Sequence, residues 1–482
     1  MSFFSDALKK SFEENKINRT HLAYVTGIDR TTIQHFINGR RMPRKDQWEA
    51  IRENLSVSPR ERENLNHEYK IAVDGVDVVR QREKVKTIIE KIAMTPALNL
   101  NHSVFSLNDR PPHHPVRAVE TEDLYGSLAI NNALIRILQE EKEEVTFFMP
   151  HNYSFFYNTL FAQYTMTPTQ KVVSLMAISN AKKRTMINLD YLEMFIPFFI
   201  SAKHDFQAYY VYSDSGFPHD NTIVPFPYFV YTSRYVLALS SEMDRGFLTK
   251  TGSIMRAYKN AFRSFLSIAH PLYHMPTLPE LVASYPRHEE SVEFHSLIAS
   301  QPYFQMYLDQ NWVEKNCVVN SEEDALLVRQ YADFLKTLKA GLHFSVAFTQ
   351  EGLDAFVETG RIQMLPPSLV NPLDIPDRVN IMRLLLNDIQ NNELKCRLVN
   401  TSKFTIPHKT THVSVLGRTL TIEHLDYDTP NVKIIHLTEE FIVEAFSEFT
   451  QYLPGTDFLH SKSETVKAFE AALEKLEAME TA

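Results

Sequence analysis

A glycine between two short amphipathic segments constrains the fold of this chain more than any other feature. The first segment follows Asn18 and ends at Gly27, and the second follows Asp29. Asn and Asp accept hydrogen bonds from the free N–H groups at the start of a helix, and Gly adopts the positive φ at which a helix ends tightly. Ala23 is small enough for two helices to approach, and the branched Ile33 fits their crossing. The sequence therefore predicts two helices that meet at a tight corner.

Apolar residues recur at helical spacing on both sides of this corner, which predicts helices over 3–15, 19–26 and 30–38. Three residues of the second helix are expected to face the core: Leu22, Ala23 and Val25. A generic helical hairpin is the alternative. The two caps, the small residue, the glycine and the branched residue together favour a helix-turn-helix, which seats its second helix in a major groove.

The distribution of charge also favours contact with a polyanion. The formal net charge is −9, which taken alone speaks against nucleic acid. Between residues 9 and 45, however, nine basic and three acidic residues give +6, so the rest of the chain carries −15 (−9 − 6). A basic head on an acidic body is typical of a small DNA-reading module attached to a larger domain.

The segment resembles the Xre / Cro–lambda-repressor-like helix-turn-helix family over about residues 3–70. The residues that carry the resemblance are Leu22-Ala23, Gly27-Ile28, Thr32-Ile33, Ile37-Asn38-Gly39-Arg40-Arg41 and Pro43. The resemblance implies a five-helix domain, with its fourth helix over 45–55 and its fifth over 59–71. The chain departs from the family at Arg19-Thr20, where a Gln is common. We therefore expect the contact at that corner to be ionic and to go to phosphate.

The side chains near the start of a recognition helix reach base edges, whereas those farther along reach the backbone. The predicted base-contacting residues are Arg30, Thr31, Gln34 and His35. Arg pairs with guanine, the Thr methyl group suits thymine and Gln pairs with adenine. The predicted phosphate-contacting residues are Arg19, Asn38, Arg40, Arg41 and Lys45. A solvated side chain is the alternative at each position.

One module of this size buries too little surface for specific binding, so a homodimer is expected. The segment 76–94 carries an apolar stripe at helical spacing that suits a dimer seam: Val78, Val85, Ile88, Ile89 and Ile92. Packing of the same stripe on the protein's own body is an equally good interpretation, because one short stripe is not a sustained heptad repeat.

Beyond the head, helices and strands alternate, which predicts a large mixed α/β region. Helix, strand, strand pair and helix occur in the same order twice, and YVLALSSEMDRG is loosely echoed by VKIIHLTEEFIV. This order suggests two similar lobes from an internal duplication. The fold class is thus multidomain, an all-α DNA-binding domain followed by an α/β regulatory region. The predicted boundaries are 1–72 for the head, 73–121 for a linker with the candidate dimer helix, 122–290 and 291–455 for the lobes, and 456–482 for a tail helix.

No catalytic signature stands out in the sequence. Gly-rich nucleotide loops, His-Glu-x-x-His and Gly-x-Ser-x-Gly are absent. The segment His460-Ser461-Lys462 starts like a phospholipase-D-type motif, but Lys467 stands where an acidic residue is needed. Cys317 and Cys396 match no metal-ligand spacing, and His113-His114 lacks a ligand partner. We therefore expect neither an enzyme nor a metal or other cofactor.

Loops at strand ends are where open α/β sheets bind ligands. The residues there that suit a small-molecule or peptide effector are His151, Asn152, Asp214 and Arg245, with ordinary loop residues as the alternative. A cleft between the two lobes would be a natural effector pocket.

The sequence as a whole favours a transcription regulator that binds double-stranded operator DNA as a dimer and senses an effector through its C-terminal region. An enzyme with a DNA-binding targeting head is one alternative, and a regulator that docks a protein or peptide partner is another. The most apolar run, 194–202, is far shorter than the ~20 residues of a membrane span. The N-terminus has no signal-peptide pattern, so a cytoplasmic protein without membrane contact is expected.

Overall fold

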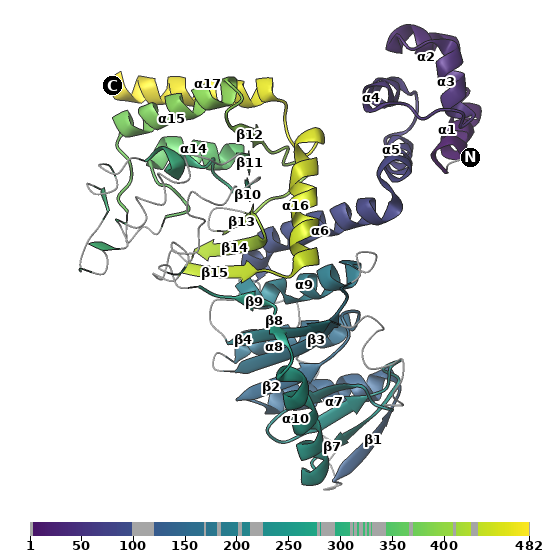
Figure 1. Ribbon diagram of the computed structural model, residues 1–482, viewed down its shortest axis with the longest axis vertical. Coiled ribbons are helices and arrows are strands. Elements are labelled where there is room, and N and C mark those ends of the chain that lie inside the picture. The colour runs from purple at the N-terminus through teal and green to yellow at the C-terminus, as the bar shows by residue number, and fades with distance from the viewer. Residues whose placement is uncertain are drawn as a thin grey trace. The chain divides into compact units, whose positions relative to one another are not determined.

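The structure, a computed structural model shown in Figure 1, contains two compact units, Met1–Lys84 and Val85–Ala482. It describes residues 3–98, 120–167, 170–180, 185–200, 205–212, 225–276, 280, 295–308, 312, 316–317, 322, 325–326, 329, 344–365, 370–407, 411–425 and 432–481. The predicted linker therefore falls largely outside the described residues, and so do His113 and His114. The sequence predicts a boundary at residue 72, whereas the units divide between Lys84 and Val85, inside a helix.

The first unit is helical throughout its described residues. Its helices are α1 Phe3–Glu14, α2 Arg19–Thr26, α3 Arg30–Ile37, α4 Lys45–Asn54, α5 Pro59–Asp74 and the start of α6 Val76–Leu98. Three aromatic rings anchor the core, because Trp48 lies 5.0 Å from Phe4 and 5.2 Å from Tyr69 between ring centroids. The polar atoms of these rings are satisfied as well, since Trp48 Nε1 donates to Asn66 Oδ1 (3.0 Å) and Tyr69 Oη to the Pro43 carbonyl (3.1 Å).

Four of the five residues of the apolar stripe of α6 are buried within the chain itself, and the fifth, Val78, is half-exposed. Val85, Ile88, Ile89 and Ile92 are fully buried and belong to the main hydrophobic core of the second unit. The prediction that this stripe forms a dimer seam is therefore wrong, and the alternative of packing on the protein's own body is what the structure has. Periodicity shows that a helix face is buried, but it does not identify the surface that covers the face.

The first sheet of the second unit has the strand order β1-β7-β6-β5-β2-β3-β4-β8 in the described chain. Its strands are β1 Thr121–Tyr125, β2 Glu144–Phe148, β3 Lys171–Ile178, β4 Phe206–Tyr212, β5 Tyr228–Tyr231, β6 Val236–Leu239, β7 Arg245–Thr249 and β8 His270–Pro271. Helices α7 Gly126–Glu140, α8 Ser154–Met166 and α9 Thr185–Ile200 contribute to the core on one face, and α10 Gly252–Leu266 packs on the other.

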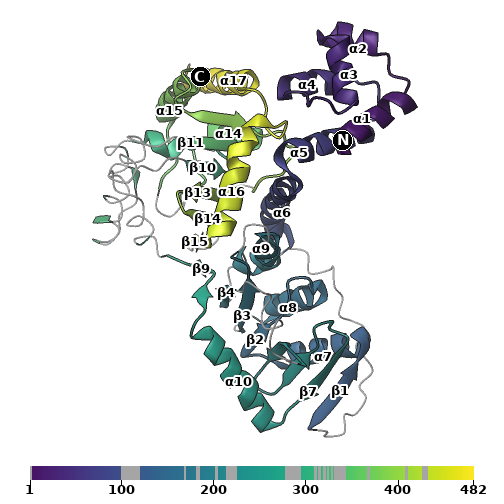
Figure 2. The ribbon, with the colours of Figure 1, turned by 45° about the vertical axis from the view of Figure 1, so that its right-hand side comes forward.

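The second sheet has the order β12-β11-β10-β13-β14-β15-β9 among the described residues. Its strands are β9 Tyr273–His274, β10 His295–Ile298, β11 Phe344–Phe348, β12 Lys395–Leu398, β13 Thr411–Leu416, β14 Thr419–Leu425 and β15 Val432–Leu437. Helices α14 Gln350–Thr359, α15 Ile375–Gln390 and α17 Lys462–Thr481 pack in one core and α16 Glu440–Tyr452 in the other. Figure 2 shows these helices around the sheet. The 3-10 turns η2 Phe304–Tyr307 and η3 Leu453–Gly455 complete the described elements.

The two sheets share one strand plan. In the first, β2, β3 and β4 run parallel, and β5, β6, β7 and β1 continue antiparallel from β2. In the second, β10, β11 and β12 run parallel, and β13, β14, β15 and β9 continue antiparallel from β10. The expected repetition is therefore present in the topology. The sequence echo that suggested it is misplaced, because it pairs β6 with β15, whereas β15 corresponds to β7.

The two lobes are fused rather than separate. The segment 270–274 pairs with β4 through β8 and with β15 through β9, so it joins the edges of both sheets. Helix α9 contacts α16, and one hydrophobic core includes residues of both lobes. Described side chains thus fill the junction at which a ligand cleft was expected.

The C-terminal helix α17 is also part of the body. Its outer face is charged, as the sequence indicated, but Phe469, Ala472 and Leu476 are buried against the second sheet's helices. Lys462 Nζ donates to the Gln390 carbonyl (2.9 Å) and to Asn392 Oδ1 (2.6 Å), so the His-Ser-Lys segment serves to attach this helix.

Candidate nucleic-acid interface

The corner between α2 and α3 has the geometry that its sequence predicts. Asn18 Oδ1 accepts hydrogen bonds from the backbone N–H groups of Thr20 (2.9 Å) and His21 (3.1 Å) at the start of α2. Gly27 then ends α2 with a φ of 69°. A side chain there would force a strained left-handed backbone, so glycine is what lets the chain turn directly into α3.

Helix α3 is held at its first turn by Asp29. One Asp29 carboxylate oxygen accepts from the N–H groups of Thr31 (2.8 Å) and Thr32 (3.1 Å), and its negative charge favours the positive end of the helix dipole. Ile33, Phe36 and Ile37 are buried on the inner face. The opposite face of α3 is consequently fixed toward solvent.

The predicted base-reading residues differ in how accessible they are. Arg30 and Thr31 are exposed in the first turn of α3, whereas Gln34 and His35 are half-buried. Gln34 Nε2 donates to Asn38 Oδ1 (3.0 Å), so each of these two amides already has a partner. Arg30 and Thr31 are therefore the side chains of α3 most ready to contact a ligand.

Basic residues surround this helix. Arg40 and Arg41 are exposed just after α3, and their backbone N–H groups both donate to the His35 carbonyl, at 2.9 and 3.4 Å. This fixes the turn that carries them. Within the described residues neither guanidinium has an ion-pair partner. Lys45 is exposed at the start of α4, and Arg19 is half-buried at the start of α2.

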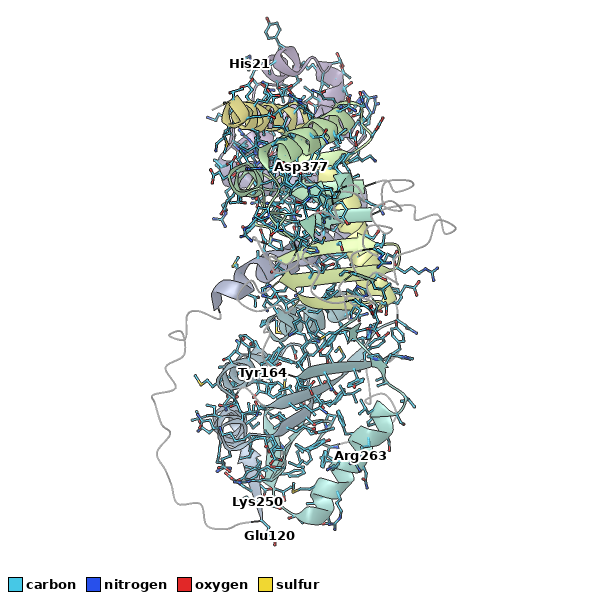
Figure 3. The ribbon with its side chains drawn as sticks, turned by 90° about the vertical axis from the view of Figure 1, so that its left-hand side faces the viewer. His21, Glu120, Tyr164, Lys250, Arg263 and Asp377 are labelled. Atoms are coloured by element: carbon cyan, nitrogen blue, oxygen red, sulfur yellow. The ribbon has the colours of Figure 1, made fainter. Side chains whose placement is uncertain are left out.

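The outer side of α2 carries an exposed aromatic residue that the sequence reasoning missed. Tyr24 is 86% exposed, and Val25, which was expected to face the core, is 40% exposed. Leu22 is buried and Ala23 half-buried, so only these two of the three predicted residues pack inward. His21, labelled in Figure 3, is exposed on the same helix. Tyr24 lies two positions after the buried Leu22, about 200° around the helix, and this spacing was the available signal that it faces outward.

The predicted effector residues do not form one site. His151 follows β2, with its Nε2 atom 3.6 Å from Asp190 Oδ2 on α9, and Asn152 beside it is exposed. Arg245 begins β7, which lies three strands from β2 in the order β7-β6-β5-β2, so the two strands are about 14 Å apart. The Arg245 side chain is exposed, and its Nε atom lies 3.8 Å from a carboxylate oxygen of Asp244. Asp214 lies outside the described residues.

A different polar cluster lies on the second sheet. His412 Nε2 is 2.9 Å from Glu423 Oε2, and the two side chains are only 4% and 12% exposed. The polar cross-strand neighbours on the same face are Ser414, Thr421, His436 and His274, and the buried Ile434 and Leu297 lie on this face opposite Glu423 and Ser414. His436 Nε2 is buried without a hydrogen-bond partner among the described residues, and burial lowers the pKa of this imidazole. The nearby carboxylate of Glu423 acts to raise the pKa of His436.

The corresponding face of the first sheet is apolar. By strand register, Val230, Leu237 and Leu248 occupy the positions that Ser414, Thr421 and His436 occupy in the second. Those three belong to the same core cluster as Ile130, Leu134 and Ile137 of α7. Buried polar groups cost free energy unless they are paired, and on this face the unpaired one among the described residues is His436 Nε2. No three of the described His, Cys, Asp and Glu side chains are placed to hold a metal ion together.

Comparison with known proteins does not assign this chain to a family. No family model matches the chain, and no curated protein matches it. One solved structure, that of TrmBL2, an archaeal chromatin protein with a novel mode of DNA binding, is 12% identical over 44% of this chain and 71% of its own, with a TM-score of 0.23. Phosphatidylserine synthase from Haemophilus influenzae Rd KW20 is 11% identical over 76% of this chain and 94% of its own, with a TM-score of 0.25. Neither similarity bears on the fold or the activity of the chain. None of the described helices is both long and apolar enough to cross a membrane.

Proposed function

We propose that the chain is a sequence-specific DNA-binding transcription regulator whose first unit is a helix-turn-helix of the Xre / Cro–lambda-repressor-like family. The observation that carries this proposal is the capped helix α3, with Arg30 and Thr31 exposed at its start and Arg40 and Arg41 exposed beyond its end. In this arrangement Arg30 reads a guanine edge in the major groove, and the other two arginines bind phosphates.

Two arginine variants separate specificity from affinity. Sequences bound by the full-length protein are selected from a random duplex library, and their affinities are measured by fluorescence anisotropy. Arg30→Ala abolishes the preference at one base pair of the selected site, a loss of about 1–3 kcal/mol. Arg41→Ala weakens binding to all sequences alike and lowers the slope of log K against log salt by about one.

Arg60→Ala is the matched control, because Arg60 is an exposed arginine of the same unit, on α5 away from the corner. This variant leaves both the base preference and the salt dependence of binding unchanged. A library that yields no preferred sequence contradicts the proposed regulator. A preferred sequence that Arg30→Ala binds with unaltered selectivity contradicts the role of Arg30.

The regulator acts as a dimer, in which two recognition helices reach half-sites about 34 Å apart. Since the stripe of α6 is buried, the dimer contact lies elsewhere. Sedimentation velocity with and without the selected duplex tests this part, and a monomer in both conditions rules it out.

The effector acts at the polar face of the second sheet, where the buried Nε2 atom of His436 has no hydrogen-bond partner among the described residues. Binding to the folded state raises thermal stability, by about 2.7 kcal/mol at a ligand concentration of 100 Kd. Metabolites that stabilise the wild type but not His436→Ala support this location. Metabolites that stabilise both proteins equally place the effector elsewhere.

A further inference from the structure

The second unit carries a basic helix in an otherwise acidic body. From Arg245 to Pro279 the sequence contains five Lys and Arg residues and no Asp or Glu. Three of the five lie on α10, at Arg256, Lys259 and Arg263. Their spacing of three and four residues places them on one side of the helix.

The apolar side of α10, about 100° around the helix from these residues, fixes the direction of the charges. Phe262 is buried, and Met255, Tyr258, Phe265 and Leu266 pack with it against the first sheet. Arg256, Lys259 and Arg263 are exposed, and among the described residues none of them has an ion-pair partner. Figure 3 shows Arg263 on this helix at the outside of the sheet.

Three unneutralised cations on one stripe repel one another and weaken the helix that carries them, so the arrangement favours an external anion. The span from Arg256 to Arg263 is about 10 Å along the helix axis, which corresponds to about three phosphates of one DNA strand. The side chains are Arg and Lys with short polar residues between them, as at Asn260 and Ser264. No large apolar residue of α10 is exposed, and the nearest one, Ile268 (66% exposed), follows two residues after the helix ends. This composition suits a phosphate backbone better than the hydrophobic interior of a lipid surface, which needs exposed apolar side chains.

We propose that the outer face of α10, formed by Arg256, Lys259 and Arg263, is a second DNA-binding surface that contacts the phosphate backbone without reading sequence. It is independent of α3, so the second unit adds affinity for any duplex, while selectivity comes from the first unit.

Charge reversal on the full-length protein tests this surface. Binding of a fluorescent 30-base-pair duplex of arbitrary sequence is measured by anisotropy from 50 to 300 mM NaCl. The triple variant R256E/K259E/R263E is expected to bind at least tenfold more weakly at 100 mM NaCl. Its salt slope falls by about 2–3, since each phosphate contact contributes ~0.9. The neutral variant R256Q/K259Q/R263Q gives a smaller loss in the same direction, and circular dichroism verifies that both variants are folded.

The control K142E/R418E/K467E makes the same change in net charge at three exposed sites away from α10. Equal losses in the two reversed variants, or no loss in R256E/K259E/R263E, overturn the proposal. Sedimentation with vesicles containing 30% phosphatidylserine tests the competing partner. If α10 reversal abolishes vesicle binding and leaves DNA binding intact, the surface is a membrane site and the proposal is wrong.

The outcome is separable from that of the proposed regulator. If the protein shows no preferred sequence but loses duplex binding when the charges of α10 are reversed, the proposed α10 surface is supported and the proposed regulator is contradicted. If the protein prefers a sequence through Arg30 and its binding is unchanged by charge reversal on α10, the regulator is supported and the α10 surface is contradicted.

Discussion

Glu141 allows a quantitative test of the first sheet's construction. It follows α7 and is 3% exposed, yet its carboxylate receives four hydrogen bonds. One oxygen accepts from the N–H groups of Lys142 (2.8 Å) and Glu143 (2.7 Å), and the other from the N–H (2.7 Å) and hydroxyl (2.6 Å) of Ser233. The residue thus ties the end of α7 to the turn between β5 and β6.

These bonds also set the ionisation of the carboxyl group. Burial alone would raise the pKa of Glu141, but the hydrogen bonds from Ser233, Glu143 and Lys142 outweigh it and lower this pKa below 4.5. An acid whose pKa is lowered by folding stabilises the folded state above its unfolded pKa. That contribution is lost as the pH falls through the folded pKa.

Glu141→Gln removes the charge and presents an amide N–H₂ to the backbone N–H of Ser233, which then loses its acceptor. A hydrogen bond to a charged group contributes about 1.5–3 kcal/mol, so we expect a loss of about 2–3 kcal/mol at pH 7. The unit has 398 residues (482 − 84), for which the unfolding entropy is about 0.8 kcal/mol/K, so Tm falls by roughly 3 °C if it unfolds as one.

Differential scanning calorimetry from pH 7 to 3.5 measures both quantities. The difference between wild type and Glu141→Gln shrinks as the pH drops below 4.5. Ser233→Ala is the control, since it removes only the hydroxyl donor, one of the four hydrogen bonds to the carboxylate, and costs about 1.5 kcal/mol. A Tm difference that stays constant over this pH range, or no difference at pH 7, refutes the reasoning.

Two further predictions concern the buried stripe and the polar face. Ile89→Ala destabilises the second unit by about 2–5 kcal/mol in denaturant titrations and leaves the oligomeric state unchanged, whereas Val78→Ala, at a half-exposed position, costs far less; a change in oligomeric state without a loss of stability would restore the dimer seam. Glu423→Ala leaves His412 buried without its carboxylate and costs about 3–5 kcal/mol, more than the double replacement His412→Phe/Glu423→Leu. If the single variant is the more stable of the two, the pair is not coupled as the structure indicates.

Local chemistry made many elements predictable. The caps Asn18 and Asp29 and the turn at Gly27 are decided by hydrogen bonds between residues at most three positions apart, and these lie where the sequence places them. Strands β3 and β4 are readable from the sequence, because they are runs rich in β-branched or aromatic residues, which favour strands. The sequence did not predict strands β1, β7, β8, β9, β10 and β11. Strand β1 forms by pairing with β7, more than a hundred residues away in the sequence. Strand β7 follows β6 after a tight turn, so the sequence pattern does not separate the two strands.

The sequence by itself determined the capped corner between α2 and α3, the mixed α/β class and most of the apolar helix positions, since these follow from short-range hydrogen bonding and periodicity. Only the tertiary structure decided what covers those faces. It buried the α6 stripe within the chain, fused the two lobes through 270–274 and placed the polar residues of β13, β14 and β15 inside the protein. A period of two along a strand distinguishes its two faces but does not reveal which one meets water. The exposed Arg30 and Thr31 were predictable because a cap three residues or fewer away fixes them, whereas the neighbours of His412 are set by strands that pair across the sheet.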